Sequence, residues 1–444
     1  MHEKIHFVGI GGIGVSSLAR YYLAKGARLS GSDLVDSDLV RELTAEGVIM
    51  RIGHHSDNLL RDVTRVIYSA AAKEDNPELK EARRRGLTCM TYAEALGELT
   101  KQYITIGVSG AHGKSTTTAL LSLMLVHAGL DPTVIIGTRL AEFGGKNVRI
   151  GKSRYLVIEA DEWNKSFFHY APQVAVITNV DAEHLDTYKN LAGVIKAFNK
   201  YVTGLPKEAT IIVNAQDKNT TSAIKGCKRT IVKFNEKGKH MPKWPLEVAG
   251  HFNQLNAEAA YRAAAVLGVT RKVASEAVAK FKGSWRRMEP LAPRAGTEVS
   301  GTFFADYAHH PTEIGATIGA FKARFRSVGT TKGKKIFVVF QPHQVARLTA
   351  LFPAFVKAFG EADQVAILPA YQVAGREVKG GKSSEDLYKG IIKLRGKAAE
   401  GTVFYLKNIA ESLNLIDKQV VVFMGAGAID AEVREYFVSQ LLPK

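Results

Sequence analysis

Short apolar runs rich in valine and isoleucine alternate along this chain with longer segments of helical periodicity. The runs fit strands at residues 5–10, 65–69, 103–108, 155–158, 174–178, 210–213, 336–340, 364–368 and 420–424. The helical segments are residues 16–25, 116–128, 256–267, 273–282, 311–325, 345–359 and 431–441. Such alternation is typical of βαβ units, in which helices pack against mostly parallel sheets. The sequence therefore predicts a protein of the α/β class.

The length of the chain and the breaks in this pattern indicate three domains. At about 150 residues per domain, the length suffices for three, each large enough to bury a core. The first is predicted to end at residue 99, before a strand that leads into a glycine-rich loop. The second is predicted to end at residue 292, because Pro290 and Pro293 interrupt a helical region. We therefore expect domains at residues 1–99, 100–292 and 293–444.

Composition is that of an ordinary globular protein. Hydrophobic residues make up 46% of the chain and charged residues 23%. No run reaches the roughly 20 apolar residues that span a bilayer, and the amino-terminal residues lack the core of a signal peptide. Cys89 and Cys227 are too few for a disulfide framework or a zinc site. We therefore expect a cytoplasmic protein without a membrane partner.

The charge balance of the chain is strongly basic. The chain has 60 Lys and Arg residues against 43 Asp and Glu, a net charge of +17. Such a balance is compatible with nucleic acid, with small polyanionic substrates or with a solvated basic surface that has no partner, and the charge alone does not decide among them. The basic stretches 225–239 and 331–335 lie between strands, are predicted to form exposed turns, and lack interleaved aromatic side chains. This favours small anionic substrates over nucleic acid.

A glycine-rich loop, Gly9-Ile10-Gly11-Gly12-Ile13-Gly14, directly follows the first strand and precedes a helix. Glycines let the backbone approach a diphosphate, and the helix N-terminus supplies N–H donors. Asp33 follows about twenty residues later, at the position that meets a ribose hydroxyl in dinucleotide-binding folds. The motif fits NAD or another nucleotide diphosphate equally well, and a tight turn without a ligand is the structural alternative.

A second loop, Gly110-Ala111-His112-Gly113-Lys114-Ser115-Thr116-Thr117, lies between a strand and an apolar helix. This is the context of a P-loop, in which backbone N–H groups surround phosphate. Lys114 has the place of the lysine that reaches the terminal phosphates, and Ser115 that of the hydroxyl on Mg²⁺. Val108 stands where the first glycine of the pattern is usual, but the remainder of the motif predicts an ATP site.

Carboxylates follow two later strands of the same predicted domain. Residues 155–158 lead into Glu159, Asp161 and Glu162, and residues 174–178 lead into a polar cluster that contains His184. Acidic residues at strand ends beside a P-loop are where Mg²⁺ is held. Two such ends in succession therefore predict a metal and phosphate site.

Two polar clusters follow strands of the last domain. The first contains Asp306, His309 and His310, and helix-start chemistry does not account for these three residues. In the second, His343 and Arg347 are four residues apart and would share a face if a helix starts there. Both clusters are candidate binding sites.

A loop for a nucleotide diphosphate and a loop for ATP together suggest a ligase that acts on a nucleotide-activated substrate. With residues 5–12, 30–33, 110–118, 159–162, 178–188, 306–313 and 340–343, the chain resembles the Mur ligase family over nearly its whole length. The resemblance implies an N-terminal Rossmann-like domain for a UDP-sugar, a central P-loop ATPase-like domain, and a C-terminal Rossmann-like domain for the amino acid and nucleotide. The first glycine loop then needs no nicotinamide.

The resemblance also implies a reaction, the joining of L-alanine to UDP-N-acetylmuramate in peptidoglycan precursor synthesis. The lactyl carboxylate of the sugar would attack the γ-phosphate of ATP, and the amine would then attack the resulting acyl phosphate. Two Mg²⁺ ions are expected, for which Mn²⁺ could substitute, and the enzyme would be a monomer or a homodimer.

The family's roles carry over to individual positions of this sequence. The catalytic residues would be Lys114, Glu159 and His184, and the metal ligands Ser115, Glu159 and His184. ATP would contact Gly110, Gly113, Lys114, Ser115, Thr116, Asn256, Arg287 and Asp306. The UDP-sugar would contact Gly11, Gly12, Gly14, His54, Ser69 and His112. The carboxylate of the amino acid would meet His343 and Arg347.

The chain departs from the family's patterns at a few positions. Gln344 replaces an arginine in the segment that faces the amino acid, which removes a charge that Gln cannot restore. Glycine or serine is therefore an alternative to alanine. Trp163-Asn164 stands where many relatives have Ser-Asp, and Lys200 lies in the region where several carry a carboxylated lysine.

Two other functions are compatible with the same motifs. One is the ligase that recycles murein peptide by joining a tripeptide to the same sugar, although residues 178–184 fit the alanine-adding type better. The other is a nucleotide-binding protein of the same fold without turnover. Intact Lys114, Glu159 and His184 argue against that alternative.

Overall fold

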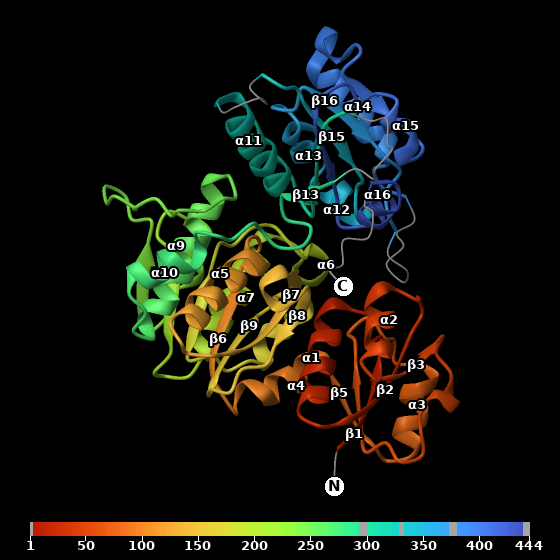
Figure 1. Cartoon of the computed structure of the whole chain (residues 1–444), viewed down its shortest axis with the longest axis vertical. Coiled ribbons are helices and arrows are strands. Elements are labelled where there is room, and N and C mark those ends of the chain that lie inside the picture. The colour runs from red at the N-terminus through yellow and green to blue at the C-terminus, as the bar shows by residue number, and fades with distance from the viewer. Residues whose placement is uncertain (1–2, 293–299, 328–332, 373–379, 438–444) are drawn as a thin grey trace. The chain divides into compact units, whose positions relative to one another are not determined.

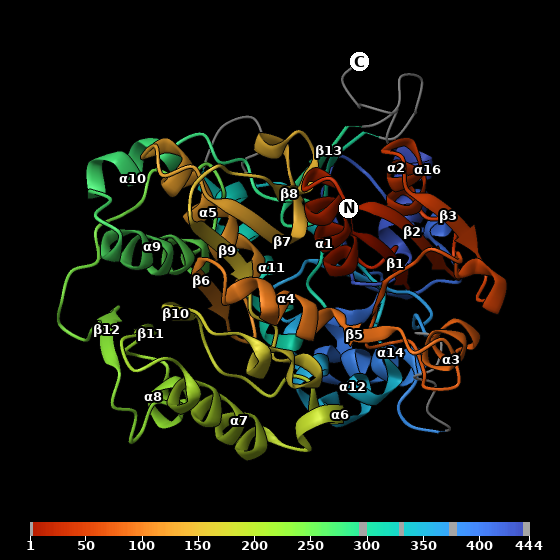
Figure 2. The same ribbon diagram turned by 90° about the horizontal axis from the view of Figure 1, so that it is seen from below.

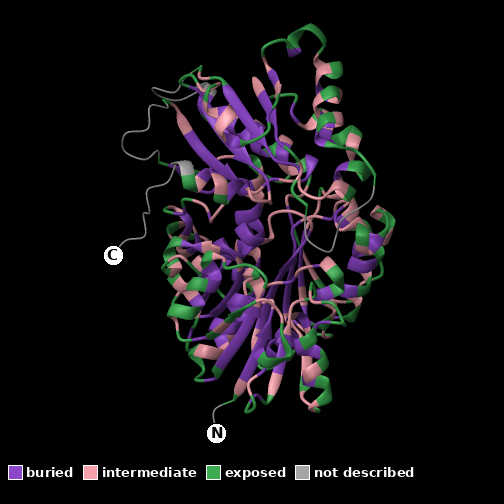
Figure 3. Cartoon of the chain, turned by 90° about the vertical axis from the view of Figure 1, so that its right-hand side faces the viewer, coloured by how far each residue is buried: buried purple, intermediate pink, exposed green. Residues whose placement is uncertain are grey.

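The computed structural model describes residues 3–292, 300–327, 333–372 and 380–437 (Figure 1). Within these residues the strands form sheets of five, seven and six strands, with helices between successive strands. The strands are mostly buried, whereas the helices carry both buried and exposed residues (Figure 3). The predicted α/β class is confirmed.

The first sheet is fully parallel and has the order β3-β2-β1-β4-β5. Its strands are β1 (Lys4–Val8), β2 (Arg28–Asp33), β3 (Ile49–Ile52), β4 (Arg65–Tyr68) and β5 (Thr88–Thr91). Its helices are α1 (Ile13–Ala24), α2 (Asp38–Ala45), η1 (Ser56–Asn58), α3 (Pro77–Arg84) and α4 (Tyr92–Thr100). Because the central strand β1 is covered on both faces, Ile5, Phe7 and Val8 are fully buried.

The second sheet has the order β12-β11-β10-β6-β9-β7-β8 and is parallel except for β8. Its strands are β6 (Ile104–Ser109), β7 (Thr133–Leu140), β8 (Lys146–Arg149), β9 (Tyr155–Glu159), β10 (Val174–Ile177), β11 (Thr210–Asn214) and β12 (Thr230–Phe234). The accompanying helices are α5 (Lys114–His127), η2 (Ala141–Phe143), η3 (Trp163–His169), α6 (Leu185–Tyr188), α7 (Leu191–Gly204), α8 (Lys218–Ala223), α9 (His251–Val266) and α10 (Arg271–Val278).

The third sheet has the order β13-β14-β18-β15-β16-β17, with only β13 antiparallel to its neighbour among the described strands. Its strands are β13 (Glu289–Leu291), β14 (Thr302–Asp306), β15 (Ile336–Phe340), β16 (Gln364–Ile367), β17 (Val403–Tyr405) and β18 (Val420–Met424). Its helices are α11 (Pro311–Ser327), α12 (Val345–Ala350), α13 (Phe352–Ala358), α14 (Ser384–Arg395), η5 (Gly396–Ala399), α15 (Ile409–Leu413) and α16 (Ile429–Phe437).

The three sheets are distributed over two compact units. The first unit comprises residues 1–245 and 255–281 and holds the first two sheets; the second comprises residues 246–254 and 282–444 and holds the third. Within the first unit, α1 packs against β7 and β8 of the second sheet (Figure 2). The boundaries expected at residues 99 and 292 remain predictions, and Pro293 lies outside the described residues.

Two local expectations are wrong. The segment 345–359 is not one helix, because α12 ends at Ala350 and α13 begins anew at Phe352, with a proline at its start. Pro353 has no N–H to continue the earlier helix and is tolerated in a first turn. The basic stretch 225–239 is also not merely a turn, since β12 lies within it as the edge strand of the second sheet.

Among the described residues, no helix combines the length and the apolar character that a membrane span requires.

Candidate active site

The P-loop connects β6 to α5 at the carboxyl edge of the second sheet. Its two glycines have left-handed backbone conformations, with φ of +129° at Gly110 and +82° at Gly113. A Cβ on Gly110 would overlap the Thr178 hydroxyl, and one on Gly113 would overlap the side-chain oxygen of Asn256. Both positions therefore require glycine for conformation and for space. The same contact brings Asn256 of α9 to the start of α5, as expected for residues that share a nucleotide.

Lys114 is held by oxygen atoms on two sides. Its Nζ donates to the carbonyl of Gly110 at 2.8 Å and lies 3.0 Å from both carboxylate oxygens of Glu162 and 3.7 Å from Asp161. Burial would lower the pKa of Lys114, but these carboxylates outweigh it and raise the pKa above its ordinary value. The lysine is therefore a fixed positive charge inside the loop.

Ser115 and Glu159 meet at the end of β9. The Ser115 hydroxyl donates to Glu159 Oε2 at 3.2 Å, and the Gly137 N–H donates to Glu159 Oε1 at 2.7 Å. Burial raises the pKa of Glu159, against the opposing effect of that N–H and of Lys114. A hydroxyl beside a carboxylate is a donor set that suits Mg²⁺, and the cation would stabilise the ionised carboxylate. These residues fit the predicted metal site.

A second group of possible ligands lies next to the first. Atoms of Asp161, Glu162 and His184 are within 4.8 Å of one another, with His184 Nε2 3.5 Å from Glu162 Oε1. Burial would raise the pKa of Asp161, but Lys114 and His184 lower it below its ordinary value. His184 has φ of +51°, which turns the chain sharply before α6. The structure therefore brings His184 to the carboxylates that follow β9.

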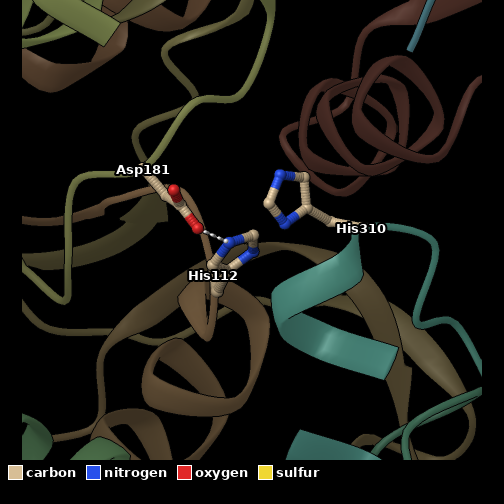
Figure 4. A group of neighbouring side chains, drawn as sticks. All are labelled: His112, Asp181 and His310. Atoms are coloured by element: carbon tan, nitrogen blue, oxygen red, sulfur yellow. Dashed lines mark hydrogen bonds and ion pairs between the residues drawn. The ribbon is translucent and has the colours of Figure 1, made fainter. Parts of the chain in front are cut away.

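His112, also in the P-loop, pairs with a carboxylate that follows β10. Its Nε2 lies 3.0 Å from Asp181 Oδ2, as Figure 4 shows. Its backbone N–H donates to Asn179 Oδ1 at 2.9 Å, and its carbonyl accepts from Thr178 and Asn179. The loops after β6 and β10 are thus joined by side-chain hydrogen bonds, which fixes the position of His112.

The expected UDP-sugar residues of the first sheet lie at the carboxyl ends of its strands. The Gly11 N–H donates to Asp33 Oδ2 at 2.8 Å, so Asp33 holds the glycine loop. A Cβ on Gly9, whose φ is +73°, would lie 2.9 Å from the Cβ of Ser69, which follows β4. His54 follows β3, and its Nδ1 lies 3.0 Å from the Ser32 hydroxyl at the end of β2. Gly11, Ser69 and His54 therefore share one edge of the sheet.

In the second unit, Asp306 and Arg287 lie near the amino end of α11. Asp306 is 5% exposed, and its carboxylate accepts hydrogen bonds from the N–H groups of Met288 and Ala308 at 2.8 and 2.9 Å. Burial raises its pKa. Arg287 lies 3.4 Å from Glu313, and its guanidinium lies over the Tyr307 ring. Asp306 thus orders this segment, and its contact with nucleotide remains a prediction.

The expected amino-acid residues are at the end of β15. The rings of His343 and Tyr371 are stacked, with centroids 5.6 Å apart and planes 8° apart. The His309 ring lies edge-on to His343, at 6.0 Å. Gln344 has φ of +67° and donates its N–H to the carbonyl of Tyr371. His310 Nδ1 accepts from the N–H of Thr312 in the first turn of α11, a helix-start contact that involves one of its two ring nitrogens.

Comparisons with known proteins relate three successive parts of the chain to one family. Family models of the Mur ligases match residues 4–104 (Mur ligase family, catalytic domain), 108–259 (Mur ligase middle domain) and 286–427 (Mur ligase, glutamate ligase domain). The chain belongs to the Mur ligase family. As a Mur ligase it is an ATP-dependent enzyme that forms an amide bond, so the predicted family, fold class and enzyme class are confirmed.

Individual Mur ligases resemble the chain from end to end. The UDP-N-acetylmuramate–L-alanine ligase of Caldanaerobacter subterraneus is 37% identical over 99% of this chain and 98% of its own. That of Aquifex aeolicus is 34% identical over 100% and 99%. The crystal structure of UDP-N-acetylmuramate–alanine ligase from Thermotoga maritima is 27% identical, covers 98% of both chains and has a TM-score of 0.79. A murein peptide ligase from Psychrobacter arcticus, 22% identical with a TM-score of 0.71, shares the fold.

Three features of the predicted sites of this Mur ligase could not be inferred from its sequence. Asp161 and Glu162 were expected near metal, yet they also hold Lys114, across 47 and 48 residues of sequence. Tyr371 stacks on His343 although no motif surrounds it. Glu78, at the start of α3, resembles an ordinary first-turn acid in the sequence but is fully buried beneath His54 and Ser32. Lys200 is exposed, with its ammonium over the Phe168 ring.

Proposed function

We propose that this Mur ligase joins L-alanine to UDP-N-acetylmuramate, with cleavage of ATP to ADP and phosphate, in peptidoglycan precursor synthesis. The observation that carries the proposal is that alanine ligases of this kind match the chain over its full length at 34–37% identity. The P-loop geometry supports it, because Lys114, Ser115 and Glu159 are arranged as an ATP-cleaving ligase requires.

The reaction proceeds in two steps. An oxygen of the lactyl carboxylate attacks the γ-phosphorus, the bond to the β-phosphate oxygen breaks, and ADP leaves with that electron pair. The amine nitrogen of alanine then attacks the acyl carbon, forming a tetrahedral intermediate that expels phosphate and loses a proton. Positioning and charge neutralisation supply most of the rate enhancement in phosphoryl transfer.

The P-loop residues act on the nucleotide. The backbone at Gly110 and the N–H groups from Gly113 to Thr116 at the start of α5 would surround the phosphates, and Lys114 would place its fixed charge beside the oxygens that gain negative charge. Ser115 and Glu159 would hold one Mg²⁺ and His184 would contribute to a second, and Mn²⁺ could substitute for either ion. When bound, Mg²⁺ neutralises phosphate charge and orients the oxygens.

The other proposed substrate contacts are assigned to individual residues. Gly11, Gly12, Gly14, His54 and Ser69 bind the UDP-sugar at the edge of the first sheet, and His112 approaches it from the P-loop. Asn256, Arg287 and Asp306 contact the nucleotide, and His343 and Arg347 the carboxylate of the amino acid. We further propose a cytoplasmic enzyme that is a monomer or a homodimer.

One residue favours a second candidate for the incoming amino acid. Gln344 occupies the position of an arginine, so this site has one guanidinium fewer for the carboxylate. Glycine or serine could then compete with alanine. The recycling of murein tripeptide is a further alternative, to which likeness with the Psychrobacter arcticus structure adds only the shared fold.

Phosphate release tests the proposal. Purified protein is mixed with ATP, Mg²⁺ and UDP-N-acetylmuramate, and each amino acid or the tripeptide is added in turn. We expect release that depends on L-alanine. A preference for glycine or serine would show what Gln344 changes, and release with the tripeptide alone would establish the recycling activity instead. Release that never depends on an amine would refute the ligase proposal.

A further inference from the structure

A fully buried carboxylate lies beneath the expected UDP-sugar site. Glu78, in the first turn of α3, has 0% exposure, and Asn76 and Pro77 fix the start of that helix. Its Oε2 lies 2.6 Å from the Ser32 hydroxyl and 3.1 Å from His6 Nε2. Its Oε1 lies 2.6 Å from Asn58 Nδ2 and 3.5 Å from His54 Nδ1. Burial alone would raise the pKa of Glu78, but these donors lower it well below its ordinary value.

The hydrogen bonds around Glu78 determine which nitrogen of His54 carries a proton. An ionised carboxylate only accepts, so the single proton of the Ser32 hydroxyl points to Glu78. The Ser32 oxygen, 3.0 Å from His54 Nδ1, must then accept from that nitrogen. His54 therefore carries its proton on Nδ1, and Nε2 is the nitrogen left to meet a ligand. The His54 side chain is 17% exposed.

Glu78 also fixes the backbone that carries His54. The His55 N–H donates to Glu78 Oε1 at 3.3 Å, and the Asn58 amide bridges Glu78 Oε1 and the carbonyl of Gly53. Gly53 has φ of +87° and begins this loop directly after β3. One carboxylate thus holds residues 53–58 against His6 in the middle of β1 and Ser32 near the end of β2.

We propose that Glu78 is a positioning residue for the uridine diphosphate moiety, acting by fixing the orientation and the tautomer of His54. The proposal rests on the proposed function, which places the UDP-sugar at this edge. With Nδ1 committed to Ser32, His54 presents Nε2 to a polar group of the nucleotide. Glu78 itself is too deeply buried to touch the ligand.

The variant E78Q tests this role, because Gln keeps the shape but replaces one acceptor oxygen with a donor. We expect the KM for UDP-N-acetylmuramate to rise about tenfold, with kcat and the KM for ATP changed by less than about twofold. S32A, which removes the bridge to His54 and leaves Glu78 intact, is expected to raise the same KM and serves if E78Q does not fold. The matched control is E258Q, which loses another fully buried carboxylate, in α9, and should leave that KM unchanged.

A double-mutant cycle shows whether Glu78 acts through His54. In the H54A background, E78Q should add less than about a twofold change in KM, because the residue it positions is already gone. The proposal would be overturned if the fold-increases in KM of E78Q and H54A multiplied in the double variant. It would also be overturned if E78Q had the wild-type KM. Two measurements separate this proposal from the proposed function. Absence of ligase turnover in the wild-type protein would refute the proposed function. Calorimetric titration of wild-type and E78Q proteins with UDP alone would still test whether Glu78 supports UDP binding.

Discussion

At the scale of single residues, the site depends on a lysine whose charge is fixed by carboxylates from the segment that follows β9. Lys114 Nζ lies 3.0 Å from Glu162 and 3.7 Å from Asp161, which keep it protonated despite burial. The same carboxylates lie beside His184, one of the expected metal ligands. The charge of Lys114 is therefore paired with carboxylates of the protein itself.

Removal of the Lys114 charge should nearly abolish turnover. K114A keeps the P-loop backbone but removes the cation that we propose to face the transferring phosphoryl group, so we expect kcat to fall by about 10³-fold or more. Steady-state release of phosphate measures it. K237A, which loses an exposed lysine on a turn, should retain normal activity. Near-normal turnover of K114A would show that the P-loop assignment is wrong.

The acid stability of the chain should carry the signature of Glu78. Its pKa is lowered in the folded state, so its contribution to stability is present above the unfolded value of about 4.3 and is lost as pH falls toward the folded value. We expect E78Q to lower the free energy of unfolding by about 2 kcal/mol at pH 7 and 5, and by progressively less below pH 4. Urea unfolding of both proteins at each pH measures the difference. A difference that stays constant down to pH 3 would contradict the assigned shift.

The sequence predicts site residues that belong to motifs, but it does not predict residues whose role depends on contacts with residues distant in the sequence. Gly110, Gly113 and Lys114 follow from spacing alone, because loop chemistry requires those residue types at those positions. Glu78 could not be found in this way, since its donors His6 and Ser32 are 72 and 46 residues distant in sequence. A first-turn acid is commonplace, and only the packing of α3 shows that this one is buried.

At the scale of elements, two helices differ in whether packing requires their glycine. Gly97, inside α4, lies so close to η3 that a Cβ would be 2.6 Å from the carbonyl oxygen of His169. Gly204, at the end of α7, has nothing within 4 Å of such an atom. Helix propensity favours alanine at both positions, and packing reverses that preference at the first.

The two substitutions should therefore have opposite effects on stability. We expect G97A to lower the free energy of unfolding by about 1–3 kcal/mol, because backbone atoms of η3 must move. G204A should leave it unchanged or raise it by up to about 1 kcal/mol. Urea denaturation compares both with the wild-type protein. A stabilised G97A would show that α4 and η3 are not packed as described.

Strands were predicted more closely than the joins between elements. The apolar runs at residues 336–340 and 420–424 match the observed bounds of β15 and β18, because a parallel strand that is buried on both faces is a continuous apolar run in the sequence. The division of 345–359 into α12 and α13 depends on the chain conformation at Leu351, and the edge strand β12 on its pairing with β11. Hydrophobic pattern alone does not determine either.

At the scale of the whole molecule, the first two sheets form one compact unit. Arg20 of α1, 4% exposed, donates to Glu42 at 2.7 Å, to Glu46 at 2.9 Å and to Asn147 of β8 at 2.6 Å. Glu42 also accepts from Arg139 of β7 at 2.6 Å. A buried guanidinium thus joins the helices of the first sheet to strands of the second.

Loss of this guanidinium should destabilise the first unit. R20M leaves Glu46 and Asn147 without their buried partner, so we expect the free energy of unfolding to fall by about 3 kcal/mol. R41M breaks only exposed ion pairs with Asp36 and Asp38 and should change it by less than about 0.5 kcal/mol. Urea unfolding distinguishes them. Equal effects of the two variants would mean that Arg20 does not join the sheets.

If phosphoryl transfer activates the sugar carboxylate, as we propose, an oxygen of that carboxylate must end in the released phosphate, and isotopic labelling detects it. UDP-N-acetylmuramate labelled with ¹⁸O in both carboxylate oxygens is converted in the presence of ATP, Mg²⁺ and L-alanine, and the released phosphate is analysed by mass spectrometry. The attacking oxygen stays on phosphorus when the amine displaces the acyl phosphate, so each phosphate should contain one ¹⁸O. Unlabelled phosphate, or release of AMP and pyrophosphate, would contradict the account.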